Sequence, residues 1–542
     1  MPLGTIAEEH AEKRVIALVT SHAVPTPRNP AKSPHGAAWM RSWKKHVPNT
    51  RVLILLSLIL VAGSAFRFYG LARQSLSSPE LSHWYRSNYD DLTSVINKGT
   101  RPDVHPPGYQ IVLFFVEKYL GDSEIALRAP SAVSGVASIF VIFLLGSRLY
   151  THREGLVASA LMAFLWCPLY YSQHARAYSM LILFSALSTY FWISLLEDCR
   201  EGPRISYLGL AGYIVTAIVT SYLHYFGLYL VFLQGIGAGV FCLVVKPKSI
   251  FYILLTYVLI AAAYVPWIPG IVEDLNRGSI YVSRPTISRV IYCFSFFFNK
   301  SNTLALIALL SYLFLLYRSG MDIVTGKKPD GEKMNTPCSP GLFLALWLAV
   351  PFLGAYVKSM ISTPILMAPY LLISLPAAYL LLSRSVTRLP LRTRLQNVVA
   401  IALVCLFLFD VIFMKQFYTT PYKQQFREAV GFIVDRDHLY EDSMIIGCTS
   451  LYCNYYFEKM GSDRRIDIMA GEKRDIPKIA DIISERNPRY VWFIRAHKHP
   501  EPSFVAFLLG ILKPITYQRF IAAEVWLFEN PAGTSDQKPS GS

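Results

Sequence analysis

The feature that most constrains the fold is a series of long apolar runs that recurs between residues 51 and 415. Runs of about 18 to 22 residues are long enough for a helix to cross the ~30 Å hydrocarbon core of a bilayer. Charged residues make up only 16% of the chain, whereas a soluble domain carries about 25%. The sequence therefore predicts an integral membrane protein with many spans.

We expect about eleven transmembrane helices. They are predicted at residues 53–69, 128–149, 155–171, 177–196, 205–224, 227–245, 250–270, 303–317, 341–358, 365–382 and 398–414. Five connections between spans are basic, at residues 148–153, 199–204, 246–248, 318–333 and 384–394. With eleven spans, all five lie on the same side of the membrane as the basic N-terminal tail. Lys and Arg accumulate in cytoplasmic loops. The net charge of +16 therefore reflects topology, and we expect no nucleic-acid partner.

One apolar segment is too short for a full crossing. GYQIVLFFVEKYL, at residues 108–120, includes Glu117 and Lys118. A crossing here would place every later basic loop outside. Half-length elements are tolerated where they line a polar cavity. We expect a juxtamembrane or re-entrant helix, and the alternative is a topology with twelve or more spans.

The remaining sequence predicts two further regions around the membrane domain. Residues 1–50 mix Pro, Ser and basic residues without an apolar core, which indicates a disordered cytoplasmic tail. After the membrane domain at 51–415, with its large extracytoplasmic loop 70–127, residues 416–530 show two helical and four strand-like patterns. The expected fold is a polytopic all-α membrane protein with a small extracytoplasmic α/β domain, ending in a disordered tail at 531–542. Cys448 and Cys453 lie in that domain, where an oxidising compartment would allow them to pair.

A polar turn connects two of the predicted spans, 155–171 and 177–196. YYSQHARAYS, at residues 170–179, places Gln173, His174 and Arg176 at the membrane boundary. Ionisable groups at membrane depth cost a few kcal/mol each and commonly mark a cavity, a pathway or a partner. Alternatively, Arg176 reaches phospholipid headgroups and the tyrosines form an interfacial belt. The turn is predicted on the same face as the carboxylates of the first loop, His105, Arg128 and His224, which favours one polar site.

Five motifs in chain order carry a family resemblance. They are HPPGYQIVLFF at His105, GDSEIALRAPSAVSG at Gly121, YYSQHARAYSMLIL at Tyr170, SYLHYFGLYL at Ser221 and VPWIPG at Val265. The series resembles the bacterial polyprenyl-phosphate-sugar-dependent glycosyltransferases of the GT-C fold. These include relatives of the protein O-mannosyltransferases and of the aminoarabinose and galacturonic acid transferases that modify lipid A. The resemblance covers about residues 66–382 and implies a multi-pass enzyme of the bacterial inner membrane.

The resemblance implies inverting transfer of a sugar from a polyprenyl phosphate to a hydroxyl of a lipid, glycan or protein. An acidic residue of the first loop then serves as general base or metal ligand. A carboxylate within hydrogen-bond reach can take the proton of the hydroxyl, and cations can stabilise the departing phosphate. The expected base is Glu80, with Asp103, Asp90 and Asp91 as rivals. The expected substrate-binding residues are Arg176 and Arg128 at the phosphate, with His105, Gln173, His174, Tyr178 and His224 as further lining.

Three positions depart from the family pattern. Pro79 stands where relatives commonly have the Asp of an Asp-Glu pair, His174 where they have Glu, and Pro369 where they have Arg. The departures imply a different donor, relocated catalytic groups or a non-catalytic member. The alternative functions are a transporter, although internal repeats typical of transporters are not visible, and a membrane protein whose outer domain binds a partner. No spacing predicts a structural zinc site, and a divalent cation in the first loop is left open.

Overall fold

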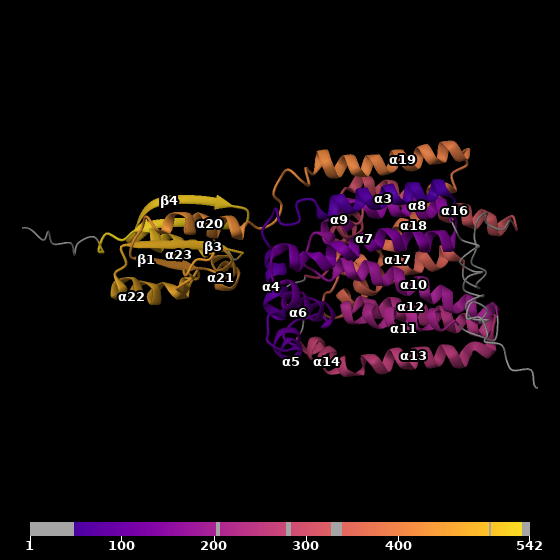
Figure 1. Cartoon of the computed structure of the whole chain (residues 1–542), viewed down its shortest axis with the longest axis horizontal. Coiled ribbons are helices and arrows are strands. Elements are labelled where there is room, and N and C mark those ends of the chain that lie inside the picture. Colours follow the sequence, from indigo (N-terminus) through magenta and orange to yellow (C-terminus); the bar gives the residue numbers. More distant parts are fainter. Residues whose placement is uncertain (1–47, 202–205, 278–282, 327–338, 498–499, 534–542) are drawn as a thin grey trace, which may run out of the picture. The chain divides into compact units, whose positions relative to one another are not determined.

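The computed structural model describes residues 48–201, 206–277, 283–326, 339–497 and 500–533 (Figure 1). The disorder predicted for residues 1–50 and 531–542 lies almost entirely outside the described residues. Thr50–Ser542 belong to one compact unit, and its described part consists of a helical membrane region followed by a small α/β domain.

Every predicted span coincides with a helix. Nine helical segments of the described residues are long and apolar enough to cross a membrane. They are α3 (Thr50–Phe68), α7 (Glu124–Leu149), α10 (Tyr178–Glu201), α12 (Phe226–Val244), η3 (Pro247–Ser249) continued by α13 (Ile250–Tyr264), η4 (Val265–Trp267) and α14 (Ile268–Arg277), α16 (Asn302–Val324), α17 (Pro340–Ile361), η5 (Ala368–Ser374) continued by α18 (Leu375–Thr387), and α19 (Thr393–Phe409) continued by η6 (Asp410–Met414). A bent pair, α8 (His152–Phe164) and α9 (Trp166–Ser172), forms one further candidate, with 58° between its halves. The remaining predicted span is the 17-residue helix α11 (Tyr207–Leu223).

The bend between α8 and α9 is stabilised by a buried arginine of α3. Arg67 donates hydrogen bonds to the carbonyls of Met162 (2.7 Å) and Ala163 (3.0 Å) at the end of α8. On the other side of the bend, the backbone N–H of Trp166 donates to Asn299 Oδ1 at 2.8 Å. Backbone groups freed inside an apolar region need such partners. These three backbone groups of the break are therefore hydrogen-bonded, and α9 leads directly into the polar turn.

The first loop forms short helices at one end of the membrane helices (Figure 1). They are α4 (Ser78–Ser87), α5 (Leu92–Ser94), η2 (Val95–Thr100) and α6 (Gly108–Leu120). Helix α4 begins with Ser77 and Glu80 in a capping box and with a proline in its first turn. Helix α6 has 13 residues and is not among the candidate spans of the described region, which agrees with the predicted juxtamembrane helix.

Helix α6 packs closely on the end of α11 because Gly108 has no side chain. A Cβ atom at this position would lie 2.6 Å from the carbonyl oxygen of Tyr222. The prolines that precede Gly108 fix the backbone where the helix starts. This contact holds the loop that carries Asp103 and His105 beside the connection that carries His224.

The C-terminal domain contains a mixed five-stranded sheet. Its strands are β1 (Ser443–Gly447), β2 (Ile468–Met469), β3 (Tyr490–Ala496), β4 (Lys513–Phe520) and β5 (Ala523–Glu529), in the order β2-β1-β3-β5-β4. β1 is parallel to β2 and β3, whereas β5 is antiparallel to β3 and β4. The helices are α20 (Phe426–Asp437), α21 (Ser450–Lys459), η7 (Lys473–Asp475), α22 (Ile476–Arg486) and α23 (Pro502–Ile511). Cys453 is a buried free thiol, so the pairing with Cys448 that the sequence left open is not formed.

Candidate functional site

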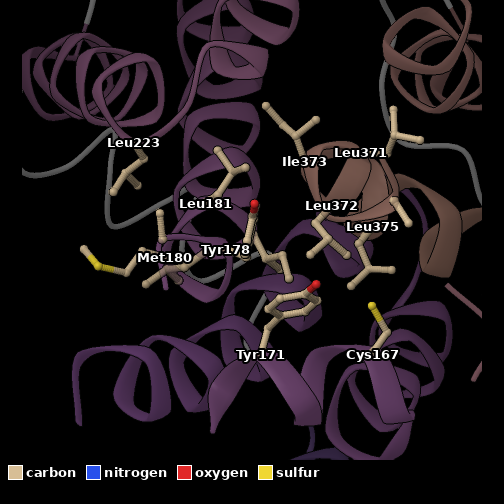
Figure 2. Close-up of a cluster of buried hydrophobic side chains, with 14 of the residues drawn as sticks. Cys167, Tyr171, Tyr178, Met180, Leu181, Leu223, Leu371, Leu372, Ile373 and Leu375 are labelled. Carbon is tan, nitrogen blue, oxygen red and sulfur yellow. The ribbon is translucent and has the colours of Figure 1, made fainter. Parts of the chain in front are cut away.

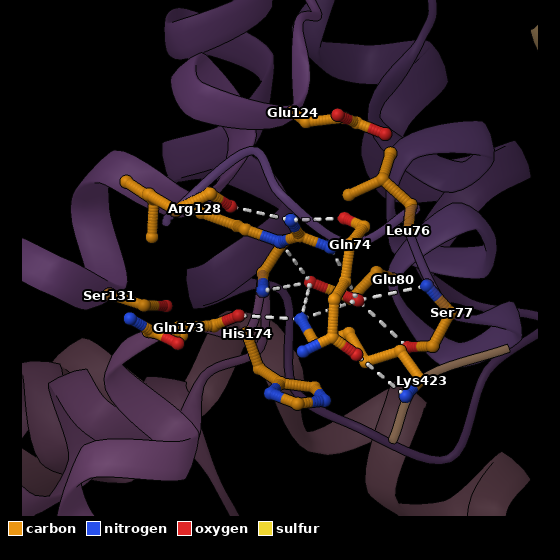
Figure 3. A network of polar contacts seen from close by, with 12 residues as sticks. Gln74, Leu76, Ser77, Glu80, Glu124, Arg128, Ser131, Gln173, His174 and Lys423 are labelled. Carbon is orange, nitrogen blue, oxygen red and sulfur yellow. Dashed lines mark hydrogen bonds and ion pairs between the residues drawn. The ribbon is translucent and has the colours of Figure 1, made fainter. Parts of the chain in front are cut away.

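Glu80 lies at the start of α4 and is fully buried (Figure 3). Arg128 of α7 contacts its carboxylate through Nε (2.8 Å to Oε1) and Nη2 (3.2 Å to Oε2). Lys423 Nζ lies 3.2 Å from both carboxylate oxygens. The backbone N–H of Ala175 donates to Oε1 at 3.0 Å, and the N–H and hydroxyl of Ser77 both donate to Oε2. These donors outnumber the roughly four lone-pair positions of a carboxylate, so none is free for a substrate proton.

We call Glu80, Arg128 and Lys423 the anchor cluster. Burial alone would raise the pKa of Glu80, but the charges of Arg128 and Lys423 outweigh it and hold that pKa well below its usual range. For Lys423, burial and the charge of Arg128 outweigh the attraction of Glu80 and lower the pKa to about 7. The carboxylate stays ionised between the Arg128 guanidinium and the Lys423 amine, which identifies it as a structural centre of this region.

Gln173 and His174 stabilise the backbone of the polar turn and its surroundings. The side-chain amide of Gln173 donates to the carbonyls of Phe66, Arg67 and Tyr69 at the end of α3, at 3.0–3.2 Å. His174 Nδ1 lies 2.9 Å from the carbonyl oxygen of Tyr170 and donates to it. Burial and the charge of Lys423 lower the pKa of His174. These two predicted substrate-binding residues therefore hold the turn in place as neutral side chains.

Asp103, His105 and His224 form a second group, which we call the histidine cluster. Asp103 Oδ2 contacts Arg86 (3.1 Å) and His105 Nδ1 (3.3 Å). Burial would raise the pKa of Asp103, but His105 and Arg86 together lower it, so the carboxylate is ionised. Because a carboxylate only accepts, Nδ1 of His105 carries the proton and Nε2 carries a lone pair. That Nε2 is buried and has no hydrogen-bond partner among the described residues.

His224 is the opposite tautomer, with a donor at Nε2 where His105 has an acceptor. The backbone N–H of Phe226 donates to His224 Nδ1 at 3.2 Å, so the ring proton of the neutral imidazole is on Nε2. Burial, assisted by the charges of His105 and Arg176, lowers the pKa of His224 well below its usual range. Its Nε2 is also buried without a partner in the described part of the chain. The rings of His105 and His224 are 5.6 Å apart, which places an acceptor and a donor side by side.

Arg176 adds a cation that retains free donors. Its guanidinium lies 5.2 Å from the ring centre of Tyr178 and contacts the Tyr178 hydroxyl at 3.3 Å. Within the described ranges it forms no ion pair with a carboxylate. The Tyr178 ring is 6.0 Å from that of His224 and 4.9 Å from that of Tyr171. Figure 2 shows Tyr171 and Tyr178 in the apolar cluster of the bundle. Arg176 is therefore suited to an anion next to the histidine cluster.

Tyr171 also lines a cavity of about 270 Å³. Two of its lining residues are the cations Arg289 and Lys300, and Lys300 Nζ is 4.1 Å from the ring centre of Trp166. The cavity also includes Pro369, the position at which the sequence lacks the family's arginine. It therefore supplies two other cations next to that position. The remaining lining residues are Tyr170, Tyr171, Tyr292, Phe296, Met367 and Ala368.

The structure thus separates the predicted site residues into three sets. Glu80 and Arg128 are in the anchor cluster, and Gln173 and His174 support the turn. Asp103, His105 and His224 form the histidine cluster, and Arg176 and Tyr178 lie beside it. The rivals Asp90 and Asp91 are exposed, and Asp91 caps α5 through Ser94. No group of three or more His, Cys, Asp or Glu side chains in the described residues could hold a metal ion.

Sequence reasoning missed three cations. Lys423 lies beyond the last span, in a linker for which the sequence showed no pattern. Lys300 directly precedes a predicted span on the side opposite the basic loops. A lysine on that side departs from the positive-inside pattern, and this departure could have marked it as a candidate site residue. Arg289 lies between the predicted spans 250–270 and 303–317, in α15 (Ile287–Phe296).

The comparisons with known proteins agree with this fold. Residues 104–269 match the family model described as dolichyl-phosphate-mannose-protein mannosyltransferase. The structure of ArnT from Cupriavidus metallidurans bound to undecaprenyl phosphate is similar, with a TM-score of 0.53, 12% identity, and coverage of 89% of this chain and 98% of that chain. Its apo structure gives a TM-score of 0.53, 14% identity, and coverage of 88% and 97%. The oligosaccharyltransferase of Archaeoglobus fulgidus in complex with Zn and sulfate gives 0.49, with 13% identity and coverage of 81% and 67%. No curated protein sequence matches the chain.

The chain is therefore a polytopic membrane protein with the GT-C fold, as its motifs indicated. The similarity to the ArnT structure confirms the predicted fold. The family model matches less than half of the chain, in a region that includes His105, Arg128, Arg176 and His224.

Proposed function

We propose that this protein is a glycosyltransferase that moves a sugar from a polyprenyl phosphate to an acceptor hydroxyl, with inversion at the anomeric carbon. The observation that carries the proposal is the Asp103–His105 pair beside the proton donor of His224 and the free guanidinium of Arg176. The similar ArnT structure is a complex with undecaprenyl phosphate, which supports a polyprenyl phosphate as the carrier.

In this mechanism, His105 is the general base and Asp103 orients it. The acceptor hydroxyl gives its proton to His105 Nε2 as its oxygen forms a bond to the anomeric carbon. Asp103 fixes the imidazole tautomer and stabilises the imidazolium that results, as a buried carboxylate does in a catalytic triad. His224 donates from Nε2 to a hydroxyl of the sugar or of the acceptor. Glu80 supports the architecture, because its lone pairs are occupied.

The leaving group is the lipid phosphate. The bond between the anomeric carbon and the phosphate oxygen breaks, and its electron pair leaves on that oxygen. Arg176 stabilises the developing charge, with Tyr178 holding the guanidinium. Lys300 and Arg289 in the neighbouring cavity attract the same phosphate. The products are the glycosylated acceptor, the polyprenyl phosphate and a proton.

The proposal places this chemistry at the extracytoplasmic face of a bacterial inner membrane. The membrane domain at 51–415, its first loop at 70–127 and the α/β domain at 416–530 then share one compartment outside the cytoplasm. The basic connections between spans support this orientation. The acceptor is a lipid, a glycan or a protein that reaches this face.

The test is sugar transfer from a panel of polyprenyl-phosphate sugars by the purified full chain in lipid nanodiscs. We expect His105→Ala to lower kcat/KM by about 10²-fold or more, as for loss of a general base. Asp103→Asn should reduce kcat, and Arg176→Ala should reduce kcat together with donor affinity. His438→Ala and Asp90→Asn are matched controls, because both side chains are exposed outside the site.

Two results would reject the proposal. In one, the folded wild-type protein transfers no sugar from any polyprenyl phosphate and moves a labelled substrate across the bilayer instead, as a transporter does. In the other, transfer occurs but His105→Ala and Asp103→Asn match the exposed controls, which would place the base elsewhere.

A further inference from the structure

Lys423 lies between the last span and the α/β domain, in a segment that returns to the first loop (Figure 3). The backbone N–H groups of Tyr422 and Lys423 both donate to Gln74 Oε1 at 2.9 Å. The next side chain, Gln424, accepts from the backbone N–H of Ser78. Consecutive linker residues are therefore hydrogen-bonded to the segment that leads into α4. The linker has a defined position against the membrane domain.

The side chain of Lys423 joins Glu80 to the polar turn. Its Nζ lies 3.2 Å from both oxygens of Glu80 and 2.6 Å from the carbonyl oxygen of Gln173, and the residue is only 5% exposed. Glu80 in turn accepts the backbone N–H of Ala175 at 3.0 Å. The turn is thus held at two positions, by Lys423 directly and by Glu80. The two contacted residues, Gln173 and Ala175, lie three positions and one position before Arg176.

We propose that Lys423 is a positioning residue for the donor phosphate. It fixes the backbone before Arg176 and so directs the guanidinium toward the histidine cluster. This inference rests on the proposed function, in which Arg176 binds the phosphate. A functional group is positioned accurately only when neighbouring contacts restrict its backbone and rotamer, and Lys423 supplies such a contact from a distant part of the sequence.

The charges of the anchor cluster make Lys423→Met an informative variant. The cluster contains two cations and one anion, so loss of Lys423 leaves Arg128 and Glu80 as a balanced pair. The variant therefore leaves no buried charge without a counter-ion and should fold. Lys423→Arg restores a cation on a long side chain and tests whether these two properties are enough to hold the polar turn. Lys459→Met is the control, since Lys459 forms an ion pair with Asp122 at 35% side-chain exposure, away from the turn.

Hydrogen–deuterium exchange of the full chain in detergent tests the contact without any activity. In Lys423→Met, the amides of residues 173–177 should exchange about tenfold faster, as expected when a hydrogen bond to a charged group is lost. Lys423→Arg should recover part of the protection, and Lys459→Met should match wild type. Unchanged exchange in Lys423→Met would overturn the inference, whether or not the protein proves to be a transferase.

Steady-state transfer tests the consequence for the reaction. The apparent KM for the polyprenyl-phosphate sugar should rise about tenfold in Lys423→Met. Its kcat should also fall, though less than in Arg176→Ala, and Lys423→Arg should recover part of both losses. Binding of undecaprenyl phosphate should weaken by a similar factor. Faster exchange with unchanged KM and binding would overturn the role in donor positioning. Absence of transfer by wild type would instead reject the proposed function, while the exchange and binding measurements would still decide the inference.

Discussion

Glu80→Gln distinguishes a structural carboxylate from a catalytic one. Glutamine keeps the size of the side chain but removes the negative charge. Arg128 and Lys423 then remain side by side without the anion that lies between them. The new amide group would also place donors against the N–H groups of Ser77 and Ala175.

The magnitude follows from the burial of the three charged groups. Glu80, Arg128 and Lys423 are 0%, 1% and 5% exposed, so water does not screen their interaction. Removing one partner of a buried ion pair costs about 3–5 kcal/mol. We expect a loss of that order for Glu80→Gln. The double variant Glu80→Gln/Lys423→Met should lose less, because it leaves one uncompensated cation in place of two.

Thermal unfolding in detergent, followed by tryptophan fluorescence, measures the stability loss, and transfer by the surviving folded fraction is measured in parallel. Asp103→Asn is the comparison, because the proposed mechanism gives this carboxylate of the histidine cluster a role in the reaction. If Glu80→Gln were as stable as wild type yet lost transfer, Glu80 would be the base that the family resemblance implies. Our assignment of the two carboxylates would then be wrong.

Three further predictions address separate regions. Burial raises the pKa of Glu117 to about 7; the folded protein therefore holds a proton that the unfolded chain releases above pH ~4.5, and stability falls as pH rises through this window. The free energy of unfolding of Glu117→Gln minus that of wild type should therefore be about 1–2 kcal/mol higher at pH 8 than at pH 4. Thermal melts at the two pH values measure this difference, and a difference that does not change with pH would contradict the prediction. Gly108→Ala should destabilise the protein by about 1–3 kcal/mol because its Cβ would collide with the Tyr222 backbone; an unchanged melting temperature would refute the close contact. Lys300→Met should weaken binding of undecaprenyl phosphate about tenfold, measured by titration in nanodiscs, whereas Lys415→Met should not.

The membrane architecture was predictable because two strong local signals agree. Apolar length identified the spans, and the basic connections fixed how many crossings separate them. Even the bent pair and the short helix α11 fall on predicted spans. The bend itself was not predicted, because Arg67 and Asn299, which stabilise it, come from distant parts of the chain.

The partners of the candidate site residues were not predictable from local sequence. Arg128 was expected at the phosphate, but it pairs with Glu80, 48 residues away. Burial decides that pairing, and burial depends on how α4, α7 and the linker pack together. The quoted motifs contain His105 and Arg176, and the first loop supplied Asp103, so all three were predicted from the sequence as site residues. The hydrogen bonds that define the tautomers of His105 and His224 required coordinates.

The contact between Lys423 and Glu80 spans 343 positions of the sequence. A ribosome completes all the membrane helices before it adds the lysine that closes this contact. A nascent chain can therefore be fully inserted and still lack an ordered turn before Arg176. The order of synthesis therefore completes this buried ion cluster only after every membrane helix has been made.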